Sequence, residues 1–248
     1  MKTTDKKIVN SFKVKEQLNP DIWNQINETF KMKPEIRDSL LKIVEDYLDF
    51  IDLDVDIEDV TLTGSLSNYN WSEFSDVDLH ILIDTPNSKN SLLKKYLDSR
   101  RIIWNSLRDI KVKDFEVEIY VQDIKEPHFA SGVYSVMYNE WIAEPKYVDF
   151  IIEPAKILTK SKGWIDKIDR VDDDSKRKDP EEVLDSIEAL KDKLKKYRGA
   201  GLNDEGEYSY ENLTFKFLRR NGYIKKLHDI RNQLIDKTLT LEGKVFGI

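Results

Sequence analysis

The chain has no cysteine among its 248 residues. Disulfide bonds, thiol nucleophiles and cysteine-ligated metal sites are therefore excluded, and the composition suits a reducing compartment. Long apolar runs are also missing, whereas a membrane-spanning helix needs roughly 20 consecutive apolar residues. The first ten residues carry three lysines but no apolar core of a signal peptide. We therefore expect a cytoplasmic protein with no membrane partner.

A surplus of positive charge is absent as well, because 47 acidic residues outnumber 40 basic ones and give a formal net charge of -7. Such a chain has no global basic field for a long nucleic acid, so any phosphate-binding surface must be local. Charge of both signs is abundant, at 35% of residues beside 40% hydrophobic residues. These proportions suit a packed core under a helix-rich surface, in one large domain or two small ones.

The apolar periodicity changes along the chain and predicts an α+β fold, with a small mixed β-sheet core flanked by helices and a helical C-terminal part. Residues 1–19 are polar and are expected to form a flexible N-terminal segment. Residues 20–150 are expected to form the domain that holds the sheet, with helices at its N-terminal side. Residues 151–248 are expected to form a separate helical domain.

Individual elements follow from the same patterns. Helical spacing predicts helices over about 20–30, 34–50 and 88–107, and two long helices near 183–199 and 213–234. In the helix over 88–107 the expected buried residues are Leu92, Leu93, Tyr96, Ile103 and Leu107. Alternation of apolar and polar residues predicts strands over 60–63, 77–83 and 112–122, and a hairpin within 133–143.

Two polar motifs stand out in the first two predicted strands. The first strand stops at Gly64-Ser65, where a glycine lets the backbone approach a phosphate and a serine offers a hydroxyl and an amide. Asp76 and Asp78 open the next strand, and a period of two puts both carboxylates on one face, with Cα atoms roughly 7 Å apart. Such carboxylates repel one another unless a cation lies between them, and hard oxygen ligands favour Mg²⁺ or Mn²⁺. The alternative is a solvent-facing strand with two ordinary aspartates.

A third carboxylate would complete a two-metal site. The predicted strand 112–122 carries three acids on the face opposite its apolar side, namely Asp114, Glu116 and Glu118. We favour Glu118 because it lies in the middle of the strand, and Glu116 stays open as an alternative. His80 shares the facing of the two aspartates and is expected either to contact substrate or to be a packed, hydrogen-bonded strand residue.

The pattern Gly64-Ser65 followed by Ser75-Asp76-Val77-Asp78-Leu79 resembles the DNA polymerase beta-like nucleotidyltransferase superfamily, over roughly residues 58–123. The resemblance implies that the glycine and serine hold a triphosphate. It also implies that Asp76, Asp78 and Glu118 bind two Mg²⁺ ions, with Mn²⁺ as an alternative. The family more often has aspartate in the third position, so a glutamate there is a departure.

The implied reaction moves a nucleoside monophosphate from a nucleoside triphosphate such as ATP to an acceptor hydroxyl or phosphate, with release of pyrophosphate. The acceptor stays open between a small molecule, a protein and an RNA 3′ end. Because related enzymes often supply a cation from helices beyond the sheet, Lys216 and Arg220 are expected to bind the nucleotide, although a solvated basic face is the alternative. A nucleotide- or RNA-binding protein that keeps the fold without turnover is the competing function.

Overall fold

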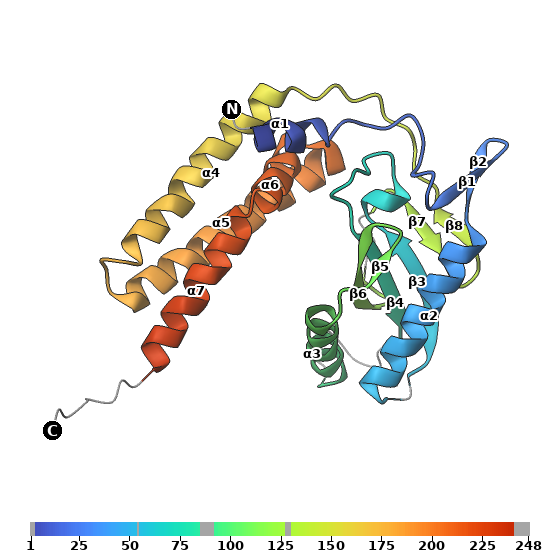
Figure 1. Cartoon of the computed structure of the whole chain (residues 1–248), viewed down its shortest axis with the longest axis horizontal. Helices are drawn as coiled ribbons and strands as arrows, with labels where there is room; N and C mark the ends of the chain where they lie inside the picture. Colours follow the sequence, from blue (N-terminus) through green and yellow to red (C-terminus); the bar gives the residue numbers. More distant parts are fainter. Residues whose placement is uncertain (1–2, 54, 85–91, 127–129, 241–248) are drawn as a thin grey trace. The chain divides into compact units, whose positions relative to one another are not determined.

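The computed structural model describes residues 3–53, 55–84, 92–126 and 130–240 (Figure 1). The predicted α+β class is confirmed, since helices accompany small mixed sheets. The chain divides into two compact units. We call Ser11–Phe150 the sheet unit, and Met1–Asn10 together with Ile151–Ile248 the helical unit. The chain passes from one unit to the other after Asn10 and again after Phe150.

The segment expected to be flexible, residues 1–19, contains instead a helix, α1 (Thr3–Asn10). This helix packs against α4 (Pro154–Asp174) and α6 (Tyr210–Arg220). Ile8 and Val9 are buried there, at 1% and 2% exposure. Phe12 and Leu18 of the following stretch are buried too. A few apolar side chains among many polar ones are enough to anchor a short segment, because burial of each large side chain contributes about 1.5–3 kcal/mol.

The main sheet has the strand order β5-β6-β4-β3-β7-β8. The strands are β3 (Ile57–Thr63), β4 (Val77–Ile83), β5 (Lys111–Val112), β6 (Phe115–Asp123), β7 (Val133–Ser135) and β8 (Glu140–Ala143). β4 and β6 run parallel, and the other neighbours are antiparallel. A parallel pair needs a crossover, which here contains α3 (Leu92–Leu107). The strands predicted over 60–63 and 77–83 and the predicted hairpin are confirmed. The strand predicted over 112–122 is instead two, because the chain turns back at residues 113–114 between β5 and β6.

One face of this sheet is apolar and supplies the core of the unit. Leu62, Leu79 and Ile119 are at most 1% exposed and cluster with residues of α2 (Pro34–Ile51), a helix that the sequence predicted. Since side chains alternate along a strand, their strand neighbours Asp78 and Glu118 lie on the other face. The apolar face therefore fixes which side of the sheet carries the polar groups.

Two further predictions for the sheet unit are wrong. Residues 20–30 do not form a helix, because β1 (Trp23–Ile26) and β2 (Thr29–Met32) form an antiparallel hairpin. Asn27 makes the turn with φ 56°, a conformation that asparagine tolerates better than most residues. The second error concerns the face of α3: of the described residues, Leu97 and Trp104 are its buried ones. The expected face is largely exposed, with Leu92 at 85% and Leu107 at 68%; residues 88–91 of that predicted helix lie outside the described part.

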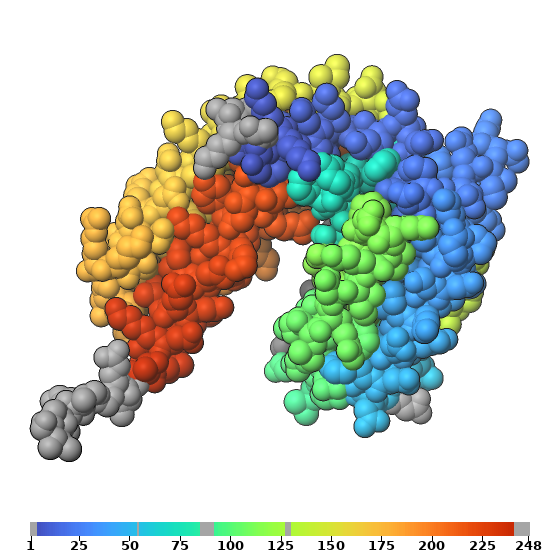
Figure 2. Space-filling view, in the orientation of Figure 1, coloured from blue at the N-terminus to red at the C-terminus, as the bar shows by residue number. Residues whose placement is uncertain are grey.

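The helical unit adds α4 (Pro154–Asp174), α5 (Pro180–Asp204), the short 3₁₀ helix η2 (Gly206–Tyr208), α6 (Tyr210–Arg220) and α7 (Tyr223–Leu239). The predicted stripe on α5 is confirmed, since Val183, Ile187 and Leu194 are buried in its core. The helix predicted over 213–234 is two helices, because Gly222 adopts φ 78° between them. The space-filling view shows α4 and α7 in contact (Figure 2). Within the described ranges, no helix has the length and apolar character to cross a membrane.

Candidate functional site

The two motifs meet where β3 ends. Thr63, the last residue of β3, is paired with Asp78 on β4. Gly64 follows with φ 75° and ψ -157°, a region that is essentially restricted to glycine. A Cβ atom added to Gly64 would lie 1.9 Å from Oδ2 and 2.8 Å from Cγ of Asp78. The carboxylate of Asp78 therefore occupies space that any residue other than glycine would fill.

Serine hydroxyls hold the segment between the motifs in place. Ser65 Oγ donates to Ser75 Oγ over 2.8 Å, and Ser75 Oγ also accepts from the Ser72 amide over 2.9 Å. Ser67 Oγ lies 3.0 Å from the Gly64 carbonyl oxygen and 2.8 Å from that of Gly132. These bonds bring the Gly-Ser turn beside the residue that precedes Asp76. The sequence singled out Gly64 and Ser65 as phosphate-binding residues, but it gave no signal for the contacts of Ser67 and Ser72.

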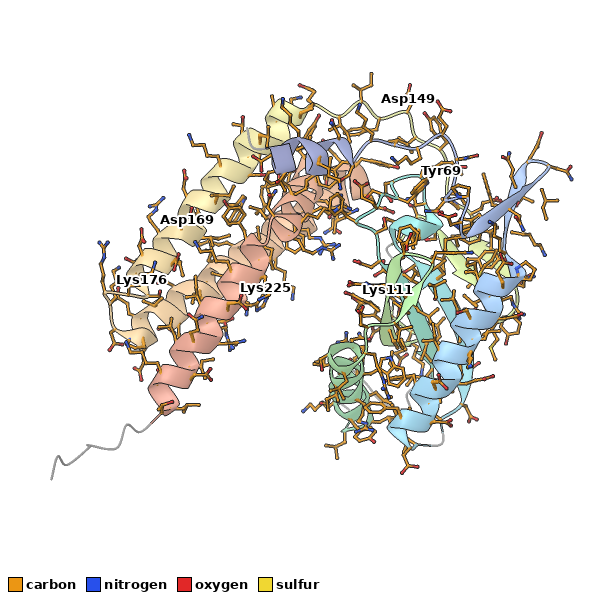
Figure 3. All side chains as sticks on the ribbon, viewed as in Figure 1. Tyr69, Lys111, Asp149, Asp169, Lys176 and Lys225 are labelled. Carbon is orange, nitrogen blue, oxygen red and sulfur yellow. The ribbon has the colours of Figure 1, made fainter. Side chains whose placement is uncertain are left out.

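Glu118 is the acid that lies in register with Asp78. The parallel ladder between β4 and β6 pairs Asp78 with Glu118, and neighbouring strands lie about 4.8 Å apart. Both side chains are half-buried. Glu116 is instead opposite Lys111 on β5, with 4.0 Å between Nζ and Oε1, and its side chain is exposed (Lys111 is labelled in Figure 3). The strand register therefore favours Glu118 over Glu116 as the partner of Asp78.

A row of polar side chains continues from these acids along the same face. His80 is in register with Tyr120, and their rings stack with centroids 5.0 Å apart and planes at 30°. His80 Nδ1 lies 2.7 Å from Oε1 of Gln122, and the Arg101 guanidinium lies 5.1 Å from the Tyr120 ring centroid. Of the two roles open for His80, its contacts fit the packed, hydrogen-bonded strand residue.

The hydroxyl of Tyr120 donates to Oε2 of Glu118 over 2.6 Å. Burial raises the pKa of Tyr120 well above its ordinary value, and the hydrogen bond to Glu118 and the negative charges of Glu118 and Asp78 raise it further. The Arg101 guanidinium opposes this shift only in part. Tyr120 is thus a neutral donor at physiological pH, and it is a site residue that the motif pattern did not reveal.

Asp76, Asp78 and Glu118 offer the hard carboxylate oxygens that Mg²⁺ and Mn²⁺ prefer. Asp76 precedes the first residue of β4 and is half-buried. Within the described residues, no three His, Cys, Asp or Glu side chains are already grouped as metal ligands. The donor set nevertheless fits a divalent cation in chemistry, and the absence of a Cβ on Gly64 gives Asp78 its place in that set. A cation shared by all three acids requires their side chains to turn toward it.

The predicted nucleotide-binding residues Lys216 and Arg220 lie on α6, in the helical unit. Burial lowers the pKa of Lys216 to about 8, against the attraction of Glu207, and the nearby charges of Arg220, Arg219 and Arg198 lower it further. Arg198, on α5, donates through Nε to Asn212 Oδ1 over 3.1 Å. Several cations and the acid Glu207 thus share one region of α5 and α6, and the surplus of positive charge there attracts anions.

No known protein family, no curated protein and no solved structure matches the chain. The functional argument therefore rests on the residues of the site and on their chemistry.

Proposed function

We propose that the chain is a metal-dependent nucleotidyltransferase that moves a nucleoside monophosphate from a nucleoside triphosphate to an acceptor and releases pyrophosphate. The observation that supports this most directly is the close approach of Gly64 to the Asp78 carboxylate, with Glu118 in register on the next strand. This geometry joins the phosphate-binding turn and the acidic cluster, the two halves of the motif that resembles the DNA polymerase beta-like superfamily.

The proposed roles follow from the position of each residue. Asp76, Asp78 and Glu118 bind two Mg²⁺ ions, or Mn²⁺ in their place, and Gly64-Ser65 holds the phosphates. The ions, when bound, stabilise the attacking and the leaving oxygens of an in-line displacement. An acceptor oxygen forms the new bond to the α-phosphorus while the bond from phosphorus to the pyrophosphate oxygen breaks, and Glu118 takes the proton of the acceptor.

The cations of α6 complete the proposal. We further propose that Lys216 and Arg220 bind the nucleotide, because their positive charge attracts its phosphates. We place the reaction in the cytoplasm. The acceptor is a small molecule, a protein side chain or an RNA 3′ end, and a local basic surface such as that of α6 is the kind of surface that an RNA end requires.

The test is incubation of the purified chain with α-labelled nucleoside triphosphates, Mg²⁺ and a cell extract, followed by identification of the labelled molecule. We expect Asp78→Asn and Asp76→Asn to lose at least about a hundredfold of the pyrophosphate release. Glu118→Gln should lose a similar factor, and the matched variant Glu116→Gln should stay close to the wild-type rate. Circular dichroism serves as the control that each variant is folded.

Three outcomes would count against the proposal. Unchanged pyrophosphate release in Asp78→Asn would refute the assignment of the acidic cluster. A loss in Glu116→Gln with full activity in Glu118→Gln would move the third carboxylate to residue 116. Nucleotide binding that needs no Mg²⁺, with no turnover in any extract, would favour the competing function of a non-catalytic nucleotide- or RNA-binding protein.

A further inference from the structure

The strand register brings the negative charges of Glu118 and Asp78 close together. Two carboxylates directly opposite one another on neighbouring strands repel. A glutamate has three rotatable side-chain bonds, so in the absence of another contact it would turn away from the aspartate and gain rotamer freedom. Some group must therefore hold Glu118 on the face of the sheet before a cation is bound.

The hydroxyl of Tyr120 is in the position to do this. It lies two residues further along β6, on the same face, and donates to Oε2 of Glu118 over 2.6 Å. The hydrogen bond involves only Oε2 of the carboxylate, and Oε1 takes no part in it. A metal-ligating carboxylate is commonly held by a hydrogen bond of this kind, which sets its orientation while the second oxygen binds the ion.

The Tyr120 ring is itself fixed by its neighbours. The stacked ring of His80 contacts it from the next strand, and the Arg101 guanidinium of α3 lies over it. His80 is held in turn by the side chain of Gln122, 2.7 Å from its Nδ1. Because residues of β4 and α3 contact the ring, the position of its hydroxyl is fixed. The hydrogen bond from this hydroxyl in turn fixes the position of the Glu118 carboxylate.

We propose that Tyr120 is a positioning residue of the metal site, whose hydroxyl holds the Glu118 carboxylate beside Asp78 in the orientation that binds a divalent cation. The proposal rests on the proposed function, because it assigns Tyr120 to the metal site that this function requires. Tyr120 contacts neither the nucleotide nor the ion in this scheme, and it acts through Glu118.

The experiment measures Mn²⁺ binding without nucleotide, from the electron paramagnetic resonance signal of the free ion. We expect Tyr120→Phe, which keeps the ring and removes only the hydroxyl, to weaken Mn²⁺ binding by about 10- to 100-fold. The matched control is Tyr138→Phe, since the Tyr138 hydroxyl donates to the backbone carbonyl of Glu58 and not to its carboxylate. This control should bind Mn²⁺ as the wild-type chain does.

A double-mutant cycle separates positioning from a general structural effect. In a Glu118→Gln background, Tyr120→Phe should change Mn²⁺ affinity little further, because the carboxylate that the hydroxyl positions is already gone. Equal losses in both backgrounds would overturn the proposal, since they would show that Tyr120 acts without Glu118. Unchanged or tighter binding in Tyr120→Phe would overturn it as well, the latter because the hydroxyl would then hold Glu118 away from the ion. If the wild-type chain binds no Mn²⁺, the proposed function fails, and this proposal fails with it.

Discussion

Gly64 is the residue whose replacement has the most direct consequence for the site. Its φ of 75° and ψ of -157° strain any other residue, and an added Cβ would overlap Oδ2 of Asp78. We expect Gly64→Ala to lower the free energy of unfolding by about 1–3 kcal/mol and to weaken Mn²⁺ binding, because Asp78 must move. Urea denaturation and the Mn²⁺ titration measure the two effects.

Gly199→Ala is the matched control for that substitution. Gly199 lies within α5, and an added Cβ would meet no atom within 4 Å. Alanine in a helix interior is about 0.5–1 kcal/mol more favourable than glycine, so this variant should be slightly more stable than the wild-type chain. A Gly64→Ala variant as stable as Gly199→Ala would show that the turn tolerates a side chain and that the contact with Asp78 is not tight.

For single residues, the sequence predicted correctly on which face of the sheet a side chain lies, because side chains alternate along a strand. Asp78 and Glu118 both fall opposite buried apolar neighbours, so their common face follows from a period of two. The hydrogen bond from Tyr120 to Glu118 and the bond from Ser65 to Ser75 did not follow, because each depends on rotamers and on distances of a few tenths of an ångström. No periodicity carries that information.

Among the elements, α6 carries a lysine, Lys216, whose positive charge lowers the free energy of unfolding by an amount that depends on pH. Lys216 is a half-buried base whose pKa falls from 10.5 to about 8 in the folded chain, chiefly because its amine is desolvated. Below pH 8 the folded state therefore holds a disfavoured charge, and stability is regained as the pH rises from about 8 toward 10.5. We expect Lys216→Met to be more stable than the wild-type chain at pH 7, with a difference that shrinks over that range in urea titrations.

Lys216 should also make anion binding depend on pH, and the affinity should fall as the pH rises whereas the stability increases. An anion favours the protonated amine, so the affinity of the wild-type chain for tripolyphosphate should fall as the pH rises through about 8. Lys216→Met should bind more weakly at pH 7 and show no such fall in calorimetry. If the two chains have the same pH profile, then Lys216 does not contact the anion.

Two elements show why the sequence could not fix every part of the fold. Ile22, Trp23, Ile26 and Phe30 match a helical spacing, yet the buried members of the hairpin are Trp23, Phe30 and Met32, while Ile26 is 49% exposed. A segment of about ten residues is too short for the spacing of its apolar residues to distinguish a helix from a β-hairpin with a two-residue turn at Asn27. In α3 the apolar side chains are spread around the helix, so the face that becomes buried depends on where α2 and β6 lie and not on spacing alone.

In the whole molecule, each unit has its own hydrophobic core. Four of the five tryptophans, Trp23, Trp71, Trp104 and Trp141, belong to the sheet unit, whereas the long helices α4 to α7 belong to the helical unit. Tryptophan fluorescence therefore reports mainly on the first unit and far-ultraviolet circular dichroism mainly on the second. We expect their thermal unfolding curves not to coincide.

Matched core variants test which curve belongs to which unit. Leu62 and Leu218 are both at most 1% exposed, one in each core, and a buried Leu→Ala change costs about 2–5 kcal/mol. Leu62→Ala should lower the fluorescence midpoint by several degrees and leave the dichroism midpoint nearly unchanged, and Leu218→Ala should do the reverse. A single transition that both variants shift together would mean that the two units unfold as one.

The placement of α1 in the helical unit has a consequence for the order in which a ribosome makes the chain. α1 precedes Ser11–Phe150 in the chain, but its partners α4 and α6 emerge only after the whole of that segment. At a synthesis rate of about 5–20 residues per second, Ile8 and Val9 lack their native contacts for on the order of ten seconds. The intervening unit is continuous in sequence, so we expect its carboxylates to assemble during translation, before the basic residues of α6 are synthesised.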